Sequence, residues 1–126
     1  MSLRTPLGRV LGLGSAREGT GHFISQRISA IALLILGAWF LLRMFAMDSF
    51  AFLEIVRFVA QPLNSVLLAL LSVTLAYHSW LGVQVVIEDY VHAPALKIIS
   101  LIAARFAHVF VAIVCLYAIL RVGLGS

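Results

Sequence analysis

Charged side chains are scarce in this sequence of 126 residues: they make up 11% of it, while hydrophobic residues make up 63%. One small soluble domain could not bury so much apolar surface, so the composition excludes an ordinary soluble protein and indicates that lipid covers part of the chain. The net charge of +4 does not indicate a nucleic-acid partner, because the cationic residues are scattered or N-terminal and no aromatic and basic surface accompanies them. We attribute the positive charge to membrane topology.

Cysteine is almost absent as well, since Cys115 is the only one and lies within an apolar run. A single thiol can form neither an intrachain disulfide nor a thiolate metal cluster. We expect Cys115 to be a small packing or lipid-facing residue.

Three apolar stretches are each long enough to cross a bilayer. A helix needs about 20 residues to span the roughly 30 Å hydrocarbon core, where it satisfies its own backbone hydrogen bonds. The expected spans run from about 28 to 47, from 63 to 87 and from 98 to 122. The second contains no charged residue, and Arg105 and His108 interrupt the third. The sequence therefore predicts an all-α membrane protein with three transmembrane helices.

Basic residues near the first span indicate its orientation. Residues 1–21 contain several glycines and are expected to form a cytoplasmic N-terminal tail, which leaves residues 22–126 as a single three-helix anchor domain. Lys and Arg gather on the cytoplasmic side of membrane proteins. More arginines precede the first span than follow it: Arg4, Arg9, Arg17 and Arg27, against Arg43 and Arg57. We expect the N-terminus to face the cytoplasm, or the matrix of a mitochondrion, and the C-terminus to face the opposite side.

The two links between the spans differ in kind. In the first, Leu53, Val56 and Val59 recur at helical spacing while polar residues occupy another face. This pattern predicts a short helix lying in the membrane interface before Pro62 begins the second span, and a loop buried against a partner would produce it equally. The second link, from Glu88 to Leu96, is short. The second and third spans should therefore be antiparallel neighbours.

His78 lies inside the charge-free second span, about ten residues and roughly 15 Å of helix from its cytoplasmic end. A histidine at this depth is costly unless it is paired or ligated. A hydrogen bond to a neighbouring helix would satisfy it, and so would coordination of haem iron by a neutral imidazole nitrogen. Gly82, four residues later on the same face, would let a flat macrocycle approach the backbone. A six-coordinate haem would then need its second ligand from another chain.

Asp89 and Tyr90 follow at the cytoplasmic end of the same span. One interpretation is that Tyr90 belongs to the aromatic belt at the membrane surface and that Asp89 is a charge flanking the helix. The pair also suits a quinone site, because a quinone carbonyl gains electrons and protons together and needs a hydroxyl donor near a proton-handling group. In that case Tyr90 would donate the hydrogen bond, and Asp89 would orient it or pass protons.

Two stretches resemble one family of respiratory membrane proteins. Residues 78–92 read HSWLGVQVVIEDYVH. This run is similar to the signature of the smaller hydrophobic membrane anchor of succinate dehydrogenase (complex II): H, then G four residues later, then DY near the helix end. Residues 14–23, GSAREGTGHF, followed by Gln26 and Arg27, resemble that family's entry into its first span. With three spans at the expected spacing, the similarity covers nearly the whole chain and is closest to alphaproteobacterial or mitochondrial members.

The resemblance implies a role for each matching residue. His78 would be one axial ligand of the haem b iron, and the larger membrane anchor, a cytochrome b-type chain, would provide the other. Tyr90 would hydrogen-bond a ubiquinone carbonyl, with Asp89 supporting this site beside the iron-sulfur subunit. With the flavoprotein subunit these chains would form a complex of the respiratory chain and the tricarboxylic acid cycle, its membrane part a multi-subunit helix bundle. The chain would have no catalytic activity alone, and we place it in the bacterial inner membrane in preference to the mitochondrial one.

Other residues carry less specific signals. His22 and Arg27 stand at the cytoplasmic start of the first span, where they would either anchor the helix end or contact haem propionates. Trp80 is two residues past His78 and is expected to point away from it, toward lipid or a neighbouring subunit.

The third span contains two polar residues three positions apart, Arg105 and His108. If their face turns inward, Arg105 would pair with Glu88, Asp89 or a propionate, and otherwise it would snorkel to the cytoplasmic headgroups. His92, in the link between spans two and three, is expected to contact the soluble subunits.

Two other functions remain open from the sequence. A small transporter or channel component would line a polar path with Arg105 and His108 and use His78 to gate protons, but three spans with few polar residues make a poor path unless the chain oligomerises. A purely structural anchor of another respiratory complex would satisfy His78 by a hydrogen bond alone.

Overall fold

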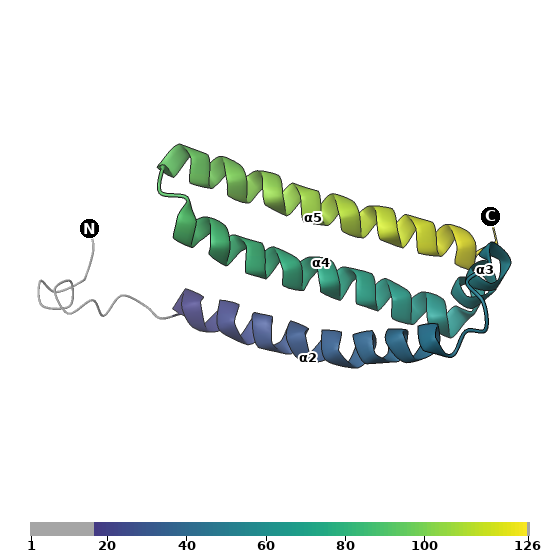
Figure 1. The fold of residues 1–126 in the computed structure, drawn as a ribbon. Coiled ribbons are helices and arrows are strands. Elements are labelled where there is room, and N and C mark those ends of the chain that lie inside the picture. Colours follow the sequence, from purple (N-terminus) through teal and green to yellow (C-terminus); the bar gives the residue numbers. More distant parts are fainter. Residues whose placement is uncertain (1–16, 126) are drawn as a thin grey trace, which may run out of the picture.

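The structure, a computed structural model, describes residues 17–125 and contains four helices and no strand within them. In chain order they are α2 (Arg17–Phe45), α3 (Phe52–Ala60), α4 (Pro62–Tyr90) and α5 (Pro94–Gly123), as Figure 1 shows. Three of them are long and apolar enough to cross a membrane: Gly19–Phe45, Pro62–Tyr90 and Pro94–Gly123. The predicted all-α fold with three spans is confirmed.

Each long helix begins before the apolar stretch that identified it, whereas α2 ends at Phe45, short of the expected end at 47. Pro62 and Pro94 occupy the first positions of α4 and α5, where a missing backbone N–H costs no helical hydrogen bond. At the other end of the chain, α2 begins at Arg17, inside the segment 1–21 that we expected to be a tail, because polar residues continue the helix beyond the apolar core. The rest of that segment, residues 1–16, lies outside the described residues.

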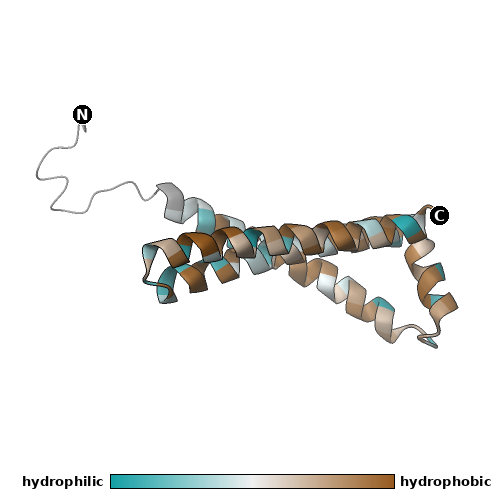
Figure 2. Ribbon diagram, turned by 90° about the horizontal axis from the view of Figure 1, so that it is seen from above, coloured by the Kyte–Doolittle hydropathy of each residue, from teal (hydrophilic) through white to brown (hydrophobic). Residues whose placement is uncertain are grey.

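The short helix expected before Pro62 is present as α3, and the link between α4 and α5 is only Val91–Ala93. α4 and α5 run antiparallel beside each other, as predicted (Figure 1). Within the described part of the chain, α2 and α5 each pack against α4 but not against each other. Seen from above, α2 crosses α4 obliquely and diverges from it toward the end where α3 packs on α4 and α5 (Figure 2). α4 is therefore the central helix.

This arrangement has almost no interior. Among the described residues only Ser29, Phe58, Asn64 and Leu81 are buried, and large apolar side chains are exposed along all three long helices. Side chains of this kind would be covered by lipid or by other helices in a membrane, where van der Waals packing and interhelical hydrogen bonds hold helices together.

Side-chain hydrogen bonds hold the corner between α3 and α4. The buried Asn64 amide donates from Nδ2 to the Phe58 carbonyl and to Gln61 Oε1, both at 2.9 Å, and the neighbouring Ser65 hydroxyl donates to the Val59 carbonyl. These bonds satisfy carbonyls at the end of α3 that its own helix leaves free. The α2 ring of Trp39 covers the corner by stacking on Phe58, with centroids 6.2 Å apart.

Substituting Asn64→Leu should destabilise this corner, because it keeps the branched shape of the side chain but leaves the Phe58 carbonyl without its donor. We expect the free energy of unfolding to fall by about 1–3 kcal/mol, measured as a lower thermal midpoint of the purified protein in detergent. Ser72→Ala is the matched control, since the Ser72 hydroxyl only donates to the Leu68 carbonyl of its own helix at 2.8 Å. Equal midpoints for the two variants would contradict this account of the corner.

Candidate functional site

His78 lies where α2 crosses α4, and a serine of α2 meets it. The half-buried His78 ring has Nδ1 2.9 Å from the Ser29 hydroxyl oxygen, and that hydroxyl also donates to the Gln26 carbonyl at 3.0 Å. His78 Nε2 has no hydrogen-bond partner among residues 17–125. One ring nitrogen is thus held by the protein and the other is available. Nothing in the sequence singled out Ser29, because a serine in an apolar span is common and its partner is 49 positions away.

A stripe of α4 continues from His78 toward the C-terminal end of the helix. Gly82 is four positions and Asp89 eleven positions further along, so all three lie close to one line on the helix surface. A Cβ built on Gly82 would meet no atom within 4 Å. No contact among the described residues therefore requires glycine there, and the space beside the His78 face is open.

Asp89 and Tyr90 form the last turn of α4, and both side chains are exposed. Lys97 of α5 donates from Nζ to the Glu88 carbonyl at 2.8 Å, which places a cation at the negative end of the α4 dipole. His92 lies in the link, with Nδ1 3.1 Å from the Tyr90 carbonyl. The backbone around Tyr90 is therefore held on both sides while its phenol, 78% exposed, stays free.

His22 and Arg27 both lie on α2, but they differ in surroundings. His22 Nε2 is buried and has no hydrogen-bond partner among residues 17–125, and His22 shares a helix face with Gln26 and Ser29, one and two turns further on. The exposed Arg27 guanidinium lies over the Phe23 ring, 5.0 Å from its centroid. The structure brings His22 to the face that packs toward α4 and leaves Arg27 at the surface.

His108 is held on both ring nitrogens. Its Nδ1 lies 2.7 Å from the Ala104 carbonyl of its own helix, and its Nε2 lies 3.1 Å from the Ser79 hydroxyl of α4. Because a carbonyl only accepts, Nδ1 carries the hydrogen and donates it, and Nε2 accepts from Ser79. His108 is thus a polar bridge between α4 and α5. The prediction that Trp80 faces lipid or another subunit was wrong: its ring packs edge-on against His108, with centroids 6.2 Å apart, because α5 covers that side of α4.

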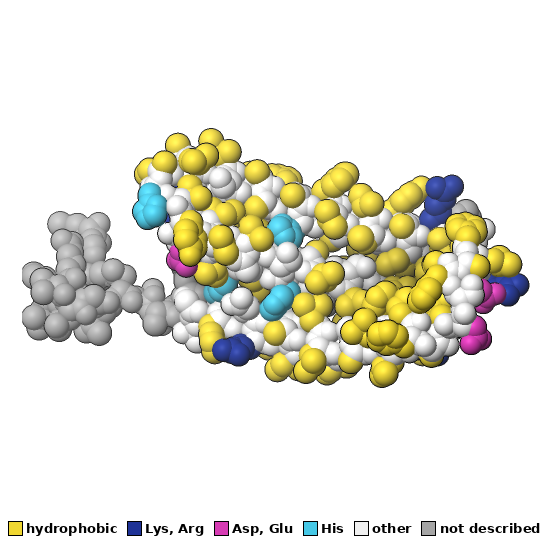
Figure 3. Space-filling model, in the orientation of Figure 1, with side chains coloured by type: hydrophobic (Ala, Val, Ile, Leu, Met, Phe, Trp, Pro, Cys, Tyr) yellow, Lys and Arg dark blue, Asp and Glu magenta, His cyan; other side chains and the backbone are white. Residues whose placement is uncertain are grey.

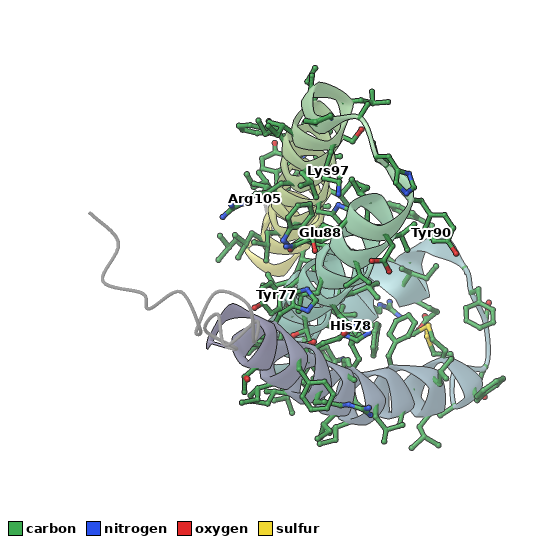
Figure 4. The ribbon with its side chains drawn as sticks, turned by 90° about the vertical axis from the view of Figure 1, so that its left-hand side faces the viewer. Tyr77, His78, Glu88, Tyr90, Lys97 and Arg105 are labelled. Atoms are coloured by element: carbon green, nitrogen blue, oxygen red, sulfur yellow. The ribbon has the colours of Figure 1, made fainter. Side chains whose placement is uncertain are left out.

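Arg105 lies on the far side of α4 from Tyr90. In Figure 4 Tyr77 and Arg105 point to one side and Tyr90 to the other. A groove of about 250 Å³ between α4 and α5 is lined by Tyr77, Arg105, Trp80 and His108. Arg105 forms no ion pair with the described acidic residues, and Glu88 instead accepts a hydrogen bond from the Gln84 amide at 2.8 Å. The inward pairing of Arg105 with Glu88 or Asp89 is not formed.

The histidines gather in one half of the molecule. Figure 3 shows their side chains in the half nearer the α4–α5 link, whereas acidic and basic side chains lie at both ends of the molecule. The histidines of the described chain therefore lie toward the end of the molecule where α2 begins and α4 ends.

The fold and these residues together define a multi-pass helical membrane protein with an available imidazole in its second span and a free phenol at the end of the same helix. Residues 1–119 match the family of succinate dehydrogenase/fumarate reductase transmembrane subunits, and the chain belongs to this family. The resemblance seen in the sequence is thereby confirmed.

Curated relatives support the same assignment. The chain is 30% identical over 116 residues to a succinate dehydrogenase hydrophobic membrane anchor subunit of Rickettsia bellii, covering 92% of this chain and 93% of that one. It is 28% identical over 122 residues to the protein of the same name from Paracoccus denitrificans, covering 97% and 94%. A third such protein, from Rickettsia typhi, is 34% identical over 84 residues, 66% of each chain.

Replacing Lys97→Met should loosen the last turn of α4, because the variant keeps the apolar stem but removes the cation that donates to the Glu88 carbonyl. We expect amide hydrogens near Glu88–Tyr90 to exchange about 2- to 5-fold faster, the effect of losing a few tenths to 1 kcal/mol at a helix end. Hydrogen exchange read by mass spectrometry measures this directly. Arg121→Met, at the far end of α5, should leave these amides unchanged, and unchanged exchange in Lys97→Met would refute the capping role.

Proposed function

We propose that this chain is the membrane anchor subunit of a succinate dehydrogenase, that His78 is one axial ligand of haem b, and that Tyr90 and Asp89 form part of the ubiquinone site. The observation that carries the proposal is the state of the His78 ring. Its Nδ1 is engaged by Ser29 at 2.9 Å while Nε2 has no partner among the described residues. A metal-ligating histidine usually has one nitrogen hydrogen-bonded by the protein and the other on the metal.

Two further features fit a macrocycle beside His78. The open space over Gly82 would accept a flat ring edge, which a side chain at that position would obstruct. The buried, unpartnered Nε2 of His22 lies on the α2 face turned toward α4, where a haem propionate would supply its missing partner. The exposed Arg27 would contribute a second, surface contact to the propionates.

Iron would be held here by a single residue of this chain. The described residues contain no group of three or more metal-ligating side chains, so the macrocycle and a second chain must complete the coordination. The larger membrane anchor, of cytochrome b type, would donate that second axial ligand. Haem b, when bound, supplies one-electron transfer, and this chain contributes the ligand, the close approach at Gly82 and the exclusion of water by its apolar helices.

The quinone site would be assembled at the cytoplasmic end of α4. The exposed Tyr90 hydroxyl would donate a hydrogen bond to a ubiquinone carbonyl, and Asp89, next to it, would orient the site or deliver protons. Reduction of a quinone consumes two electrons and two protons, so a donor and a proton-handling group belong together at this point. The iron-sulfur subunit would cover this end and deliver electrons that the flavoprotein subunit takes from succinate.

This chain would contribute no catalysis alone and would reside in the cytoplasmic membrane of a bacterium with its N-terminus in the cytoplasm. The excess of arginine before the first span supports that orientation. A transporter or channel role has weaker support, because His108 has both ring nitrogens engaged between helices and would not relay protons without breaking those bonds.

His78→Ala should abolish the haem b absorption of the purified complex, because it removes the axial nitrogen from this chain. The measurement is a dithionite-reduced minus oxidised spectrum at matched protein concentration. His108→Ala is the matched control, a second histidine of the same membrane region that should keep the full spectrum. Retention of the wild-type spectrum in His78→Ala would exclude it as an essential ligand.

Tyr90→Phe should slow succinate-dependent ubiquinone reduction roughly 10-fold, the effect of losing one hydrogen bond of about 1.4 kcal/mol in the rate-limiting step. Succinate oxidation coupled to a soluble dye should stay at the wild-type rate, since the dye bypasses the membrane site. Tyr117 is also exposed but lies on α5, so Tyr117→Phe should change neither rate. A wild-type rate of ubiquinone reduction in Tyr90→Phe would contradict the proposed role of Tyr90 in the quinone site.

A further inference from the structure

We propose that Ser29 is the positioning residue for His78: its hydroxyl fixes the imidazole in the tautomer that leaves Nε2 free, and strengthens that nitrogen as a donor to iron. This inference rests on the proposed function of His78 as a haem ligand. It assigns to α2 a part in the haem site that the sequence motif on α4 does not contain.

The single hydrogen of the Ser29 hydroxyl decides the direction of its contact with His78. A serine hydroxyl has one hydrogen to donate and two lone pairs that accept. The Gln26 carbonyl, 3.0 Å away, is an acceptor only and takes that hydrogen. With that hydrogen donated to the carbonyl, we assign the 2.9 Å contact with His78 the opposite direction, with Nδ1–H donating to the Ser29 oxygen. A neutral imidazole protonated on Nδ1 has its lone pair on Nε2, which is the atom a metal would take.

The second histidine of the membrane region provides a comparison within the same molecule. His108 also contacts a serine across a helix interface, but there the hydroxyl of Ser79 donates to Nε2 while Nδ1–H is taken by the Ala104 carbonyl. Both nitrogens are used, so His108 has none left to bind iron. The two serine and histidine pairs have opposite polarity, and only the pair at Ser29 leaves a free donor atom.

Burial makes the Ser29 bond persistent. Ser29 is 3% exposed, the lowest value among the described residues, in a structure where most side chains face outward. Water therefore cannot replace the hydroxyl at Nδ1, and an unpaired N–H at this depth would be costly. The small side chain also allows α2 to approach α4 closely, so packing and hydrogen bonding are both set by one residue.

The bond should act on the electronic properties of the ligand as well as on its orientation. A histidine that donates its second N–H to an oxygen is a more basic ligand, and a more basic ligand stabilises the oxidised, more positive metal. Ser29 should therefore hold the midpoint potential of haem b below the value it would have without this hydroxyl.

The test is Ser29→Ala in the assembled complex, because alanine keeps the side chain small and removes only the oxygen. We expect the haem to be retained with roughly 10-fold weaker affinity, and its midpoint potential in a redox titration to shift to more positive values. Ser29→Gly removes the same hydroxyl and should shift the potential in the same direction. It provides a second measurement if the alanine variant assembles poorly. Ser29→Thr keeps the hydroxyl and should retain the wild-type potential.

Ser79→Ala is the matched control, since it removes the other serine hydroxyl that contacts a membrane histidine and should leave the haem potential unchanged. An unchanged or more negative midpoint potential in the assembled Ser29→Ala and Ser29→Gly complexes would overturn the inference. A role in packing alone predicts no shift of the potential. A hydroxyl that donates to His78 Nδ1 predicts a shift to lower values. Failure of the proposed function is a separate result, namely a haem spectrum that survives His78→Ala.

Discussion

A polar side chain inside the hydrocarbon layer must have its hydrogen-bonding groups satisfied, and the arrangement of this molecule depends on how that requirement is met. Water is absent at that depth, so a neighbouring helix or a ligand must supply each partner. His108 is satisfied entirely within the chain and holds α5 to α4. His78 is satisfied on one side only, by α2. The crossing of α2 over α4 is thus fixed beside His78 Nε2, an imidazole nitrogen that forms no hydrogen bond with the described residues.

The described chain is a set of helices arranged around one central helix and not a closed bundle. α4 carries the contacts to α2, α3 and α5, and few residues are buried. A surface so apolar needs to be covered by lipid or by other membrane subunits. This agrees with the chain's membership of the succinate dehydrogenase/fumarate reductase transmembrane subunit family. The residues proposed to bind haem and quinone run along the second half of this central helix, from the half-buried His78 to the exposed Asp89 and Tyr90, so the sites would be shared with neighbouring chains.

The sequence predicted the fold well, because length and hydropathy of apolar runs are enough to define membrane helices. Pro62 and the short link before α5 also marked helix ends correctly. Helix rotation could not be predicted, because it depends on which side chains of different helices meet. For that reason the pairing of Ser29 with His78 was missed and Trp80 was assigned to the wrong surroundings. The motif on α4 identified the candidate site residues, but only the three-dimensional structure shows how His78 is held.

The three-residue link between α4 and α5 has a consequence for biogenesis. Closing so short a link costs little chain entropy, whereas α2 is separated from α4 by the longer segment 46–61, which includes α3. The α4–α5 pair should therefore associate first within the bilayer, and α2 should dock on it afterwards at the Ser29 crossing. In a copy of this chain that has not assembled with partner subunits, α2 would then be the least tightly packed helix. Membrane quality-control proteases could recognise unassembled chains by this loosely packed helix.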